Sequence, residues 1–324
     1  MPFSRVEEDI EHRSIKEVCS DPNGPSSNNV LLRMASGAAN RRASSTAVKI
    51  DVDLVLVNST VTDSGGRSVT GLDRNHFHVW EDNVEQAIQY FSTEEVPVSV
   101  GIVFDMSGSM NGKISIARDA VMTFLKTGSP NDEYTLVEFN NRPQVVQDFT
   151  SDIIEVQNRI ALVSPSGWTA LYDAVYLGMQ QLRRAHNPRR ALLLITDGED
   201  NHSHYTFSDV KEIARESNIQ LYTIDVGGYS IPMGTRGNRS VLPGRAVLEE
   251  LVSLTGGQAF FTTDVRKLED ISSRISEDLR NQYVLGYIPT NSSKNGKWRK
   301  LRLKVNPSSQ VSVHAKSGYY APID

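Results

Sequence analysis

The chain has 324 residues, of which 39% are apolar and 23% charged, so it has the length for two domains and the composition of an ordinary globular protein. The formal net charge of −5 argues against nucleic acid or an anionic membrane as the main partner. A single cysteine, Cys19, excludes an intrachain disulfide, and no apolar run approaches the roughly 18–20 residues of a membrane span.

The first 47 residues are rich in Ser, Asn, Gly and Arg, a composition typical of a disordered leader. They lack the basic start and the apolar core of a secretory signal peptide, so we expect no such signal in this segment.

Residues 48–95 have the pattern of a small β module. Apolar and polar residues alternate over 48–57 and 77–81, which predicts half-buried strands. The turn sequence at 64–66 predicts a further short strand after it. This segment is too small for a complete core of its own.

Residues 96–281 alternate apolar runs with helical patterns, which indicates βαβ units and a mainly parallel sheet covered on both faces. Residues 144–149 follow a connection too short for a crossover, so we expect an antiparallel hairpin strand there. The expected strands are 98–104, 134–139, 190–196, 219–226 and 258–262, and the expected helices are 112–127, 152–163, 170–185, 207–217, 244–255 and 264–281.

The tail, 282–324, returns to β structure, with a hairpin signal at Asn295-Gly296 and strands expected at 283–288, 298–305 and 311–315. Neither flank has enough strands for a stable pair of sheets, so we expect 48–95 and 282–324 to form one β-sandwich module. The predicted fold is α/β, with a doubly wound, mainly parallel sheet inserted in this small β-sandwich.

The strand at 98–104 runs into Asp105, and Ser107 and Ser109 follow at a spacing of two. One carboxylate and two hydroxyls at the end of a buried strand are hard oxygen donors of low total charge, which suit a small cation such as Mg²⁺. Two later segments offer more donors: Thr169 follows a glycine loop, and Asp197 ends the strand at 190–196. In an open α/β sheet ligands bind beyond the carboxyl ends of the strands, where Asp105 and Asp197 are expected.

This combination resembles the von Willebrand factor A domain and its metal-ion-dependent adhesion site. The three motifs occur in the family's order: Asp-x-Ser-x-Ser at 105–109, Gly-x-Thr-Ala-Leu at 167–171 and Thr-Asp-Gly at 196–198. The flanks are similar to those of a bacterial family related to this domain, and the integrin β-subunit head has a similar insertion. The flanking residues that carry the resemblance are 61–63, 71–72, Phe77, 81–82, Gln86, 282–283, 286–287, Pro289 and 318–320.

The resemblance implies a non-enzymatic module that binds Mg²⁺, with Mn²⁺ or Ca²⁺ as alternatives, and captures an Asp or Glu of a protein partner, as in cell adhesion. The metal would be held by Asp105, Ser107, Ser109, Thr169 and Asp197. Such modules usually work outside the cytoplasm, which favours an extracytoplasmic location, although the segment that begins this chain shows no export signal. The partner's identity and the oligomeric state are not encoded in any pattern that we identify.

Several side chains near the expected site are candidates for contact with the partner. Met106, Trp168, Tyr205 and Tyr229 could form an apolar and aromatic rim, and Glu199 would adjust the charge beside the metal.

Two other functions stay open. A hydrolase that uses Ser107 or a metal-activated water would need a base, and only His202 and His204 are candidates. A scaffold with a purely structural metal is the other. The segment 108–113 superficially suggests a phosphate loop but has the wrong spacing between glycines and Ile114 in place of Ser or Thr, so we reject it.

Overall fold

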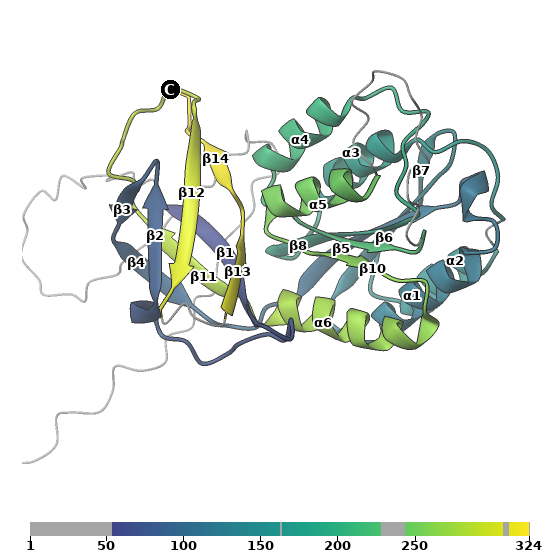
Figure 1. The fold of residues 1–324 in the computed structure, drawn as a ribbon, viewed down its shortest axis with the longest axis horizontal. Helices are drawn as coiled ribbons and strands as arrows, with labels where there is room; N and C mark the ends of the chain where they lie inside the picture. The colour runs from purple at the N-terminus through teal and green to yellow at the C-terminus, as the bar shows by residue number, and fades with distance from the viewer. Residues whose placement is uncertain (1–53, 163, 228–243, 307–310, 324) are drawn as a thin grey trace, which may run out of the picture.

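The computed structural model describes residues 54–162, 164–227, 244–306 and 311–323. Within them, an α/β domain and a β-sandwich lie side by side (Figure 1). The leader expected over 1–47, the start of the strand expected at 48–57 and the rim candidate Tyr229 lie outside the described residues. No helix within the described ranges is both long and apolar enough to cross a membrane.

The α/β domain is built on a six-stranded sheet in the order β10-β9-β8-β5-β6-β7. Every pair is parallel except the β6–β7 hairpin, as the sequence predicts. The strands are β5 (Val98–Asp105), β6 (Glu133–Phe139), β7 (Pro143–Thr150), β8 (Arg189–Thr196), β9 (Gln220–Asp225) and β10 (Ala259–Phe261).

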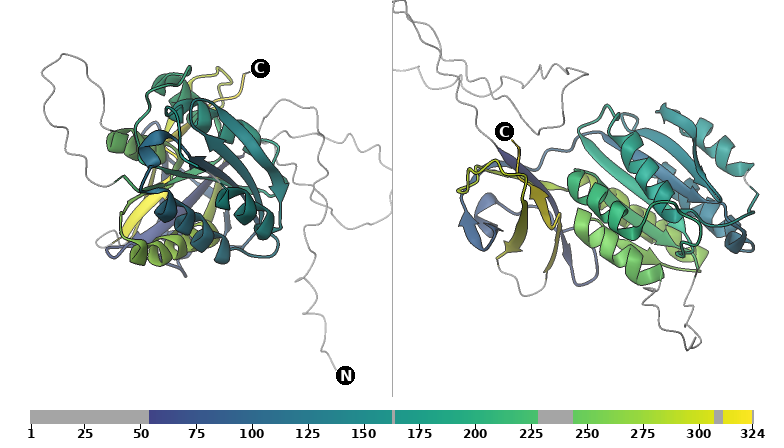
Figure 2. Two further views of the ribbon diagram at one scale, coloured as in Figure 1. Left: turned by 90° about the vertical axis from the view of Figure 1, so that its right-hand side faces the viewer. Right: turned by 90° about the horizontal axis from the view of Figure 1, so that it is seen from above.

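Helices cover both faces of this sheet, as Figure 2 shows from the side and from above. Strand β5 is buried throughout because its side chains alternate between two cores: Ile102 and Phe104 pack with α1, α2 and α6, while Val103 packs with α3, α4 and α5. The helices are η2 (Gly108–Met110), α1 (Ile114–Lys126), α2 (Ile153–Ala161), α3 (Leu171–Leu182), α4 (Phe207–Glu216), α5 (Gly244–Thr255), η3 (Val265–Lys267) and α6 (Leu268–Arg280).

The flanks on either side of this domain combine into two four-stranded sheets, ordered β13-β1-β11-β4 and β14-β12-β2-β3. Strand β1 pairs directly with β11, which follows the α/β domain, and one apolar core fills the space between the sheets. The elements are β1 (Val55–Asp63), η1 (Arg74–His76), β2 (Phe77–Glu81), β3 (Val84–Gln86), β4 (Ile88–Ser92), β11 (Tyr283–Tyr287), β12 (Trp298–Val305), β13 (Val311–Ala315) and β14 (Gly318–Tyr320).

A buried polar cluster ties the two sheets together. Glu81 on β2 is 3% exposed and accepts hydrogen bonds from the hydroxyls of Tyr287 and Tyr319, each at 2.7 Å. Arg299 on β12 donates to the same carboxylate at 2.9 Å. The buried charge is therefore paired and hydrogen-bonded, as burial requires.

Three details of the sequence prediction are wrong. The Asn295-Gly296 turn does not join a hairpin, because β11 and β12 belong to different sheets and the chain crosses between them. Gly296 has the positive φ that its turn signal suggests, but its N–H bonds to the Pro322 carbonyl. The strand expected after residue 66 is a single bridge at Ser68, and the start of the helix expected at 264–281 forms the separate 3-10 turn η3, in which Val265 is 47% exposed.

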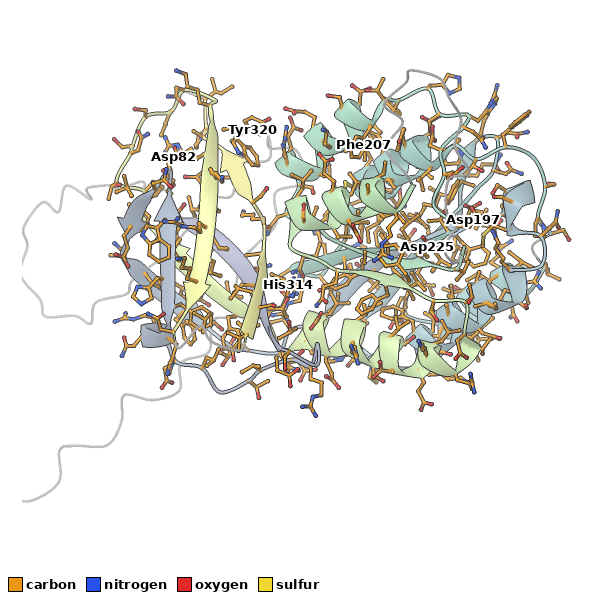
Figure 3. The ribbon with its side chains drawn as sticks, viewed as in Figure 1. Asp82, Asp197, Phe207, Asp225, His314 and Tyr320 are labelled. Atoms are coloured by element: carbon orange, nitrogen blue, oxygen red, sulfur yellow. The ribbon has the colours of Figure 1, made fainter. Side chains whose placement is uncertain are left out.

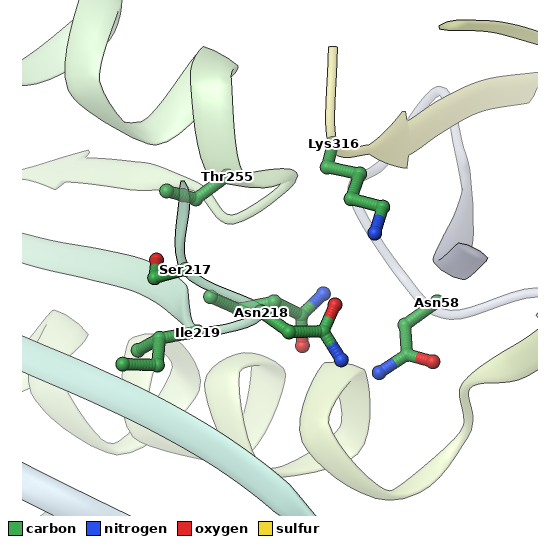
Figure 4. A pocket seen from close by; sticks show the side chains of 7 residues that line it. Asn58, Ser217, Asn218, Ile219, Thr255 and Lys316 are labelled. Carbon is green, nitrogen blue, oxygen red and sulfur yellow. The ribbon is translucent and has the colours of Figure 1, made fainter. Parts of the chain in front are cut away.

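The sandwich meets the α/β domain through polar contacts. Asp278 on α6 accepts hydrogen bonds from Ser68, at 3.0 Å, and from Gln258. A cavity of about 10 Å³, room for about one water, also lies at this junction. Figure 4 shows its lining, with Lys316 reaching from the sandwich side toward Asn218. Burial lowers the pKa of Lys316 to about 8.

Candidate metal centre

The candidate site is built at the carboxyl ends of β5, β8 and β9, three neighbouring parallel strands. Strand β5 ends in Asp105, β8 is followed by Asp197, and β9 ends in Asp225. Figure 3 labels Asp197 and Asp225, which lie in the α/β domain. Because parallel strands end at one edge of the sheet, all three carboxylates lie along that edge although they are far apart in the sequence.

Asp105 is fully buried and held at both oxygens. Its Oδ1 accepts the Ser107 backbone N–H at 2.8 Å, and its Oδ2 accepts the Thr196 hydroxyl at 2.7 Å. Burial raises the pKa of Asp105 to about 6, an effect that the hydrogen bonds from Ser107 and Thr196 oppose and that the charge of Asp197 reinforces.

The two serines link Asp105 to Asp197. Ser107 Oγ lies 2.9 Å from Ser109 Oγ, and the Ser109 hydroxyl donates to Asp197 Oδ1 at 3.0 Å. Four of the five predicted metal ligands are therefore joined in one continuous series of hydrogen bonds.

The fifth, Thr169, lies on a loop that the backbone holds against the Asp-x-Ser-x-Ser segment. Gly108 donates to the Gly167 carbonyl at 2.9 Å, and a Cβ at residue 108 would stand 3.1 Å from that oxygen. On its other side, Thr169 N–H donates to Asn201 Oδ1 at 2.8 Å, and its carbonyl accepts the Asn201 N–H at 3.0 Å. Thr169 thus lies between the loops that carry Ser107 and Asp197, and the residue is buried.

Three residues at this edge were not predicted as part of the site. Thr196 fixes Asp105 as described, and the Lys113 ammonium lies 2.9 Å from Asp197 Oδ2. Asp225 is 5% exposed, and burial raises its pKa, with the charge of Asp197 acting in the same direction. The sequence held a signal for Asp225, since it ends an apolar strand as Asp105 does. Lys113 appeared only in the rejected phosphate-loop pattern.

The donor chemistry fits a small hard cation. Within the described ranges there is no group of three or more His, Cys, Asp and Glu side chains placed to hold a metal, so the set depends on serine and threonine hydroxyls beside the carboxylates. Carboxylate and hydroxyl oxygens without imidazole or thiolate suit Mg²⁺ or Mn²⁺ better than Zn²⁺.

The predicted partner contacts differ in how they are placed. Trp168 is 60% exposed and stacks on His202 with ring centroids 6.2 Å apart, while Met106 is half-buried and Glu199 is exposed. Tyr205 is 41% exposed but stacks on Tyr176 at 4.0 Å, so part of its ring is already covered.

A polar depression of about 560 Å³ opens beside Met106 and His202. It extends the candidate site over the β6–β7 hairpin. Its lining consists of Met106, Glu138, Asn140, Asn141, Arg142, Gln144 and His202.

Neither candidate base is directed at Ser107 in the part of the chain that the structure describes. His204 Nδ1 lies 3.0 Å from Asp173 Oδ2, and His202 stacks on Trp168. The Ser107 hydroxyl instead pairs with Ser109.

Comparison with known proteins gives one family match and several distant relatives. The family model of the von Willebrand factor type A domain matches residues 100–199. The human inter-alpha-trypsin inhibitor heavy chain H4 is 24% identical over 244 residues, which are 69% of this chain and 25% of that protein. The mouse inter alpha-trypsin inhibitor, heavy chain 4, is 30% identical over 128 residues, 35% of this chain and 14% of that protein. The chain thus spans about a quarter of the length of the human relative.

Solved structures with similar folds include a von Willebrand factor type A protein from Catenulispora acidiphila, with 12% identity, a TM-score of 0.47 and coverage of 84% of this chain and 74% of that one. The protein BatB from Bacteroides thetaiotaomicron has 21% identity and a TM-score of 0.45 over 56% of this chain and 98% of that one.

The family match includes Asp105, Thr169 and Asp197, and the six-stranded sheet with helices on both faces surrounds it. Residues 100–199 therefore belong to a von Willebrand factor type A domain.

Proposed function

We propose that this chain binds a protein partner through a divalent cation held by Asp105, Ser107, Ser109, Thr169 and Asp197. The observation that supports it most is the series of hydrogen bonds from Asp105 through Ser107 and Ser109 to Asp197, since it gathers oxygen donors from two strand ends at one point. Mg²⁺ is the proposed ion, with Mn²⁺ or Ca²⁺ as alternatives.

The charge of the donor set explains why such a site would take a carboxylate. The two aspartates balance the charge of a divalent ion only in formal terms, because the other three donors are neutral hydroxyls. Lys113 is paired with Asp197 and so reduces the negative charge that this carboxylate offers the ion. When bound, the ion would supply an electrophilic position for an Asp or Glu side chain of the partner.

The surroundings fit a macromolecular ligand. Exposed Trp168 and the depression beside Met106 adjoin the loops of the site, and both offer surface for residues next to the captured acid. Exposed aromatic side chains are common anchors at protein interfaces.

The test is direct capture of a carboxylate. Protein loaded with Mn²⁺ is titrated with N-acetyl-aspartate amide while water-proton relaxation is measured, with N-acetyl-asparagine amide as the matched control. We expect the aspartate compound alone to reduce the relaxation enhancement, because it displaces water from the ion. Equal responses to the two compounds would contradict the proposal.

The hydrolase alternative is tested by replacing both histidines. Capture of N-acetyl-aspartate amide should survive the His202→Ala, His204→Ala double substitution, because neither side chain is a proposed ligand. If removal of the metal lowers the stability, but the protein captures no carboxylate even when it is loaded with the metal, the scaffold alternative is favoured.

A further inference from the structure

We propose that the Lys113 ammonium competes with the divalent ion for Asp197 and so weakens metal binding. The inference rests on the proposed function, because it concerns the same site. Its basis is the ion pair between Lys113 Nζ and Asp197 Oδ2, at 2.9 Å.

Both oxygens of Asp197 are already in use. Oδ1 accepts the Ser109 hydroxyl at 3.0 Å, and Oδ2 accepts Lys113. The Asp197 side chain is 7% exposed, so solvent screens this pair less than an ordinary surface ion pair. A divalent ion that approaches Asp197 therefore meets a carboxylate that already has a positive partner.

The position of Lys113 is not explained by the helix that it precedes. Lys113 is the N-cap of the 13-residue helix α1 and makes no side-chain capping hydrogen bond. Lysine is not among the residues favoured at an N-cap, and a positive charge is disfavoured at the N-terminal end of a helix. The carboxylates of Asp197, which follows β8, and Asp225, at the end of β9, give this cation its favourable surroundings.

The Lys113 side chain is also placed so that it can leave Asp197 when a divalent ion binds. It is 33% exposed, and the four-carbon stem can carry the ammonium toward solvent when a divalent ion takes Asp197. Removal of the ammonium should therefore favour the divalent ion, by about tenfold in Kd for one opposing charge at this range.

The experiment compares Lys113→Met with Lys126→Met, which removes an exposed lysine from the far end of the same helix. EDTA-stripped proteins are titrated with Mg²⁺ by calorimetry. We expect about tenfold tighter binding for Lys113→Met and no change for Lys126→Met. Lys113→Gln is a second variant in case the methionine impairs folding.

A second readout does not depend on the metal. In EDTA, Lys113→Met should lower the Tm, and should lower it no further once Asp197→Asn has removed the partner. Equal or weaker Mg²⁺ binding by both Lys113 variants would overturn the competition while leaving the proposed function intact. An absence of Mg²⁺ binding in every protein would overturn both, whereas binding by the Lys113 variants alone would establish the competition.

Discussion

The Thr196 hydroxyl donates a hydrogen bond of 2.7 Å to Asp105 Oδ2 and so joins the ends of two neighbouring parallel strands. The same hydroxyl oxygen accepts the Gly198 N–H at 3.0 Å, which shapes the turn that carries Asp197. One side chain thus orients both proposed carboxylate ligands, although it is not itself proposed to touch the metal.

Thr196→Val should weaken Mg²⁺ binding and cost about 1–3 kcal/mol of stability, because it leaves the buried Asp105 carboxylate with one hydrogen bond fewer. Calorimetric titration and urea unfolding measure the two effects. Thr223→Val is the matched control: Thr223 is equally buried, and its hydroxyl has no hydrogen-bond partner within the described residues. If the two variants behaved alike, the role given to Thr196 would be wrong.

Trp168 should report on the partner without holding the metal. Because its side chain is 60% exposed, Trp168→Phe should leave the Mg²⁺ affinity unchanged and the stability within about 0.5 kcal/mol of the parent protein. The tryptophan fluorescence change on adding N-acetyl-aspartate amide to the Mg²⁺-loaded protein should disappear in this variant. A change that persists would have to come from Trp80 or Trp298, and would exclude Trp168 as a neighbour of the captured acid.

The buried cluster in the sandwich should dominate the stability of that module. Arg299→Met should destabilise the protein by about 3–5 kcal/mol, because it leaves the Glu81 carboxylate buried without its cation. The double variant Arg299→Met, Glu81→Gln should recover part of this loss. Chemical unfolding of both variants and the parent measures the coupling, and strict additivity of the two substitutions would refute it.

Asp278 should make the protein more stable in mild acid. Burial raises its pKa to about 6, whereas an aspartate in the unfolded chain titrates near 3.8. Above pH 6 the carboxylate is charged in both states, and its burial is unfavourable. Between pH 6 and 4 the folded state takes up the proton first, so stability rises as the pH falls through this window.

Asp278→Asn removes this contribution while keeping a side chain that can accept from Ser68. The variant should be more stable than the parent at pH 7, by at most about 3 kcal/mol, and the difference should vanish near pH 4. Urea unfolding across pH 4–7 is the measurement, and a difference independent of pH would contradict it. The contribution of Asp105 cancels because it is present in both proteins.

Much of the fold follows from local patterns in the sequence. Apolar runs that end in Asp105 and Thr196 identify buried parallel strands, and their polar ends indicate one edge of the sheet. The contacts that pair β1 with β11 join residues more than two hundred positions apart, which no local pattern reveals. The pairing of the two flanks is predicted only because neither flank has enough strands for a stable pair of sheets. The Asn295-Gly296 signal does not identify a hairpin, because a turn sequence fixes the local φ and leaves open which strands the turn connects.

The proposed donors follow from sequence motifs, whereas most of the residues that surround them were not singled out in the sequence. Ser107, Ser109 and Thr169 were identified from motifs that the chain carries in order. Asp225 ends an apolar strand as Asp105 does, but Lys113 has no distinctive neighbours in the sequence. The packing of α1 and β9 brings both residues to Asp197. Charges gathered from separate elements are a property of the folded chain.

The most direct test of the proposed function is calorimetric titration of EDTA-stripped protein with Mg²⁺, comparing the parent, Asp105→Ala and the control Asp119→Ala, which removes an exposed carboxylate of α1. We expect one saturable site in the parent and in Asp119→Ala, and none in Asp105→Ala. Equal Mg²⁺ binding by Asp105→Ala, or no binding by the parent, would contradict the metal centre on which the proposal depends.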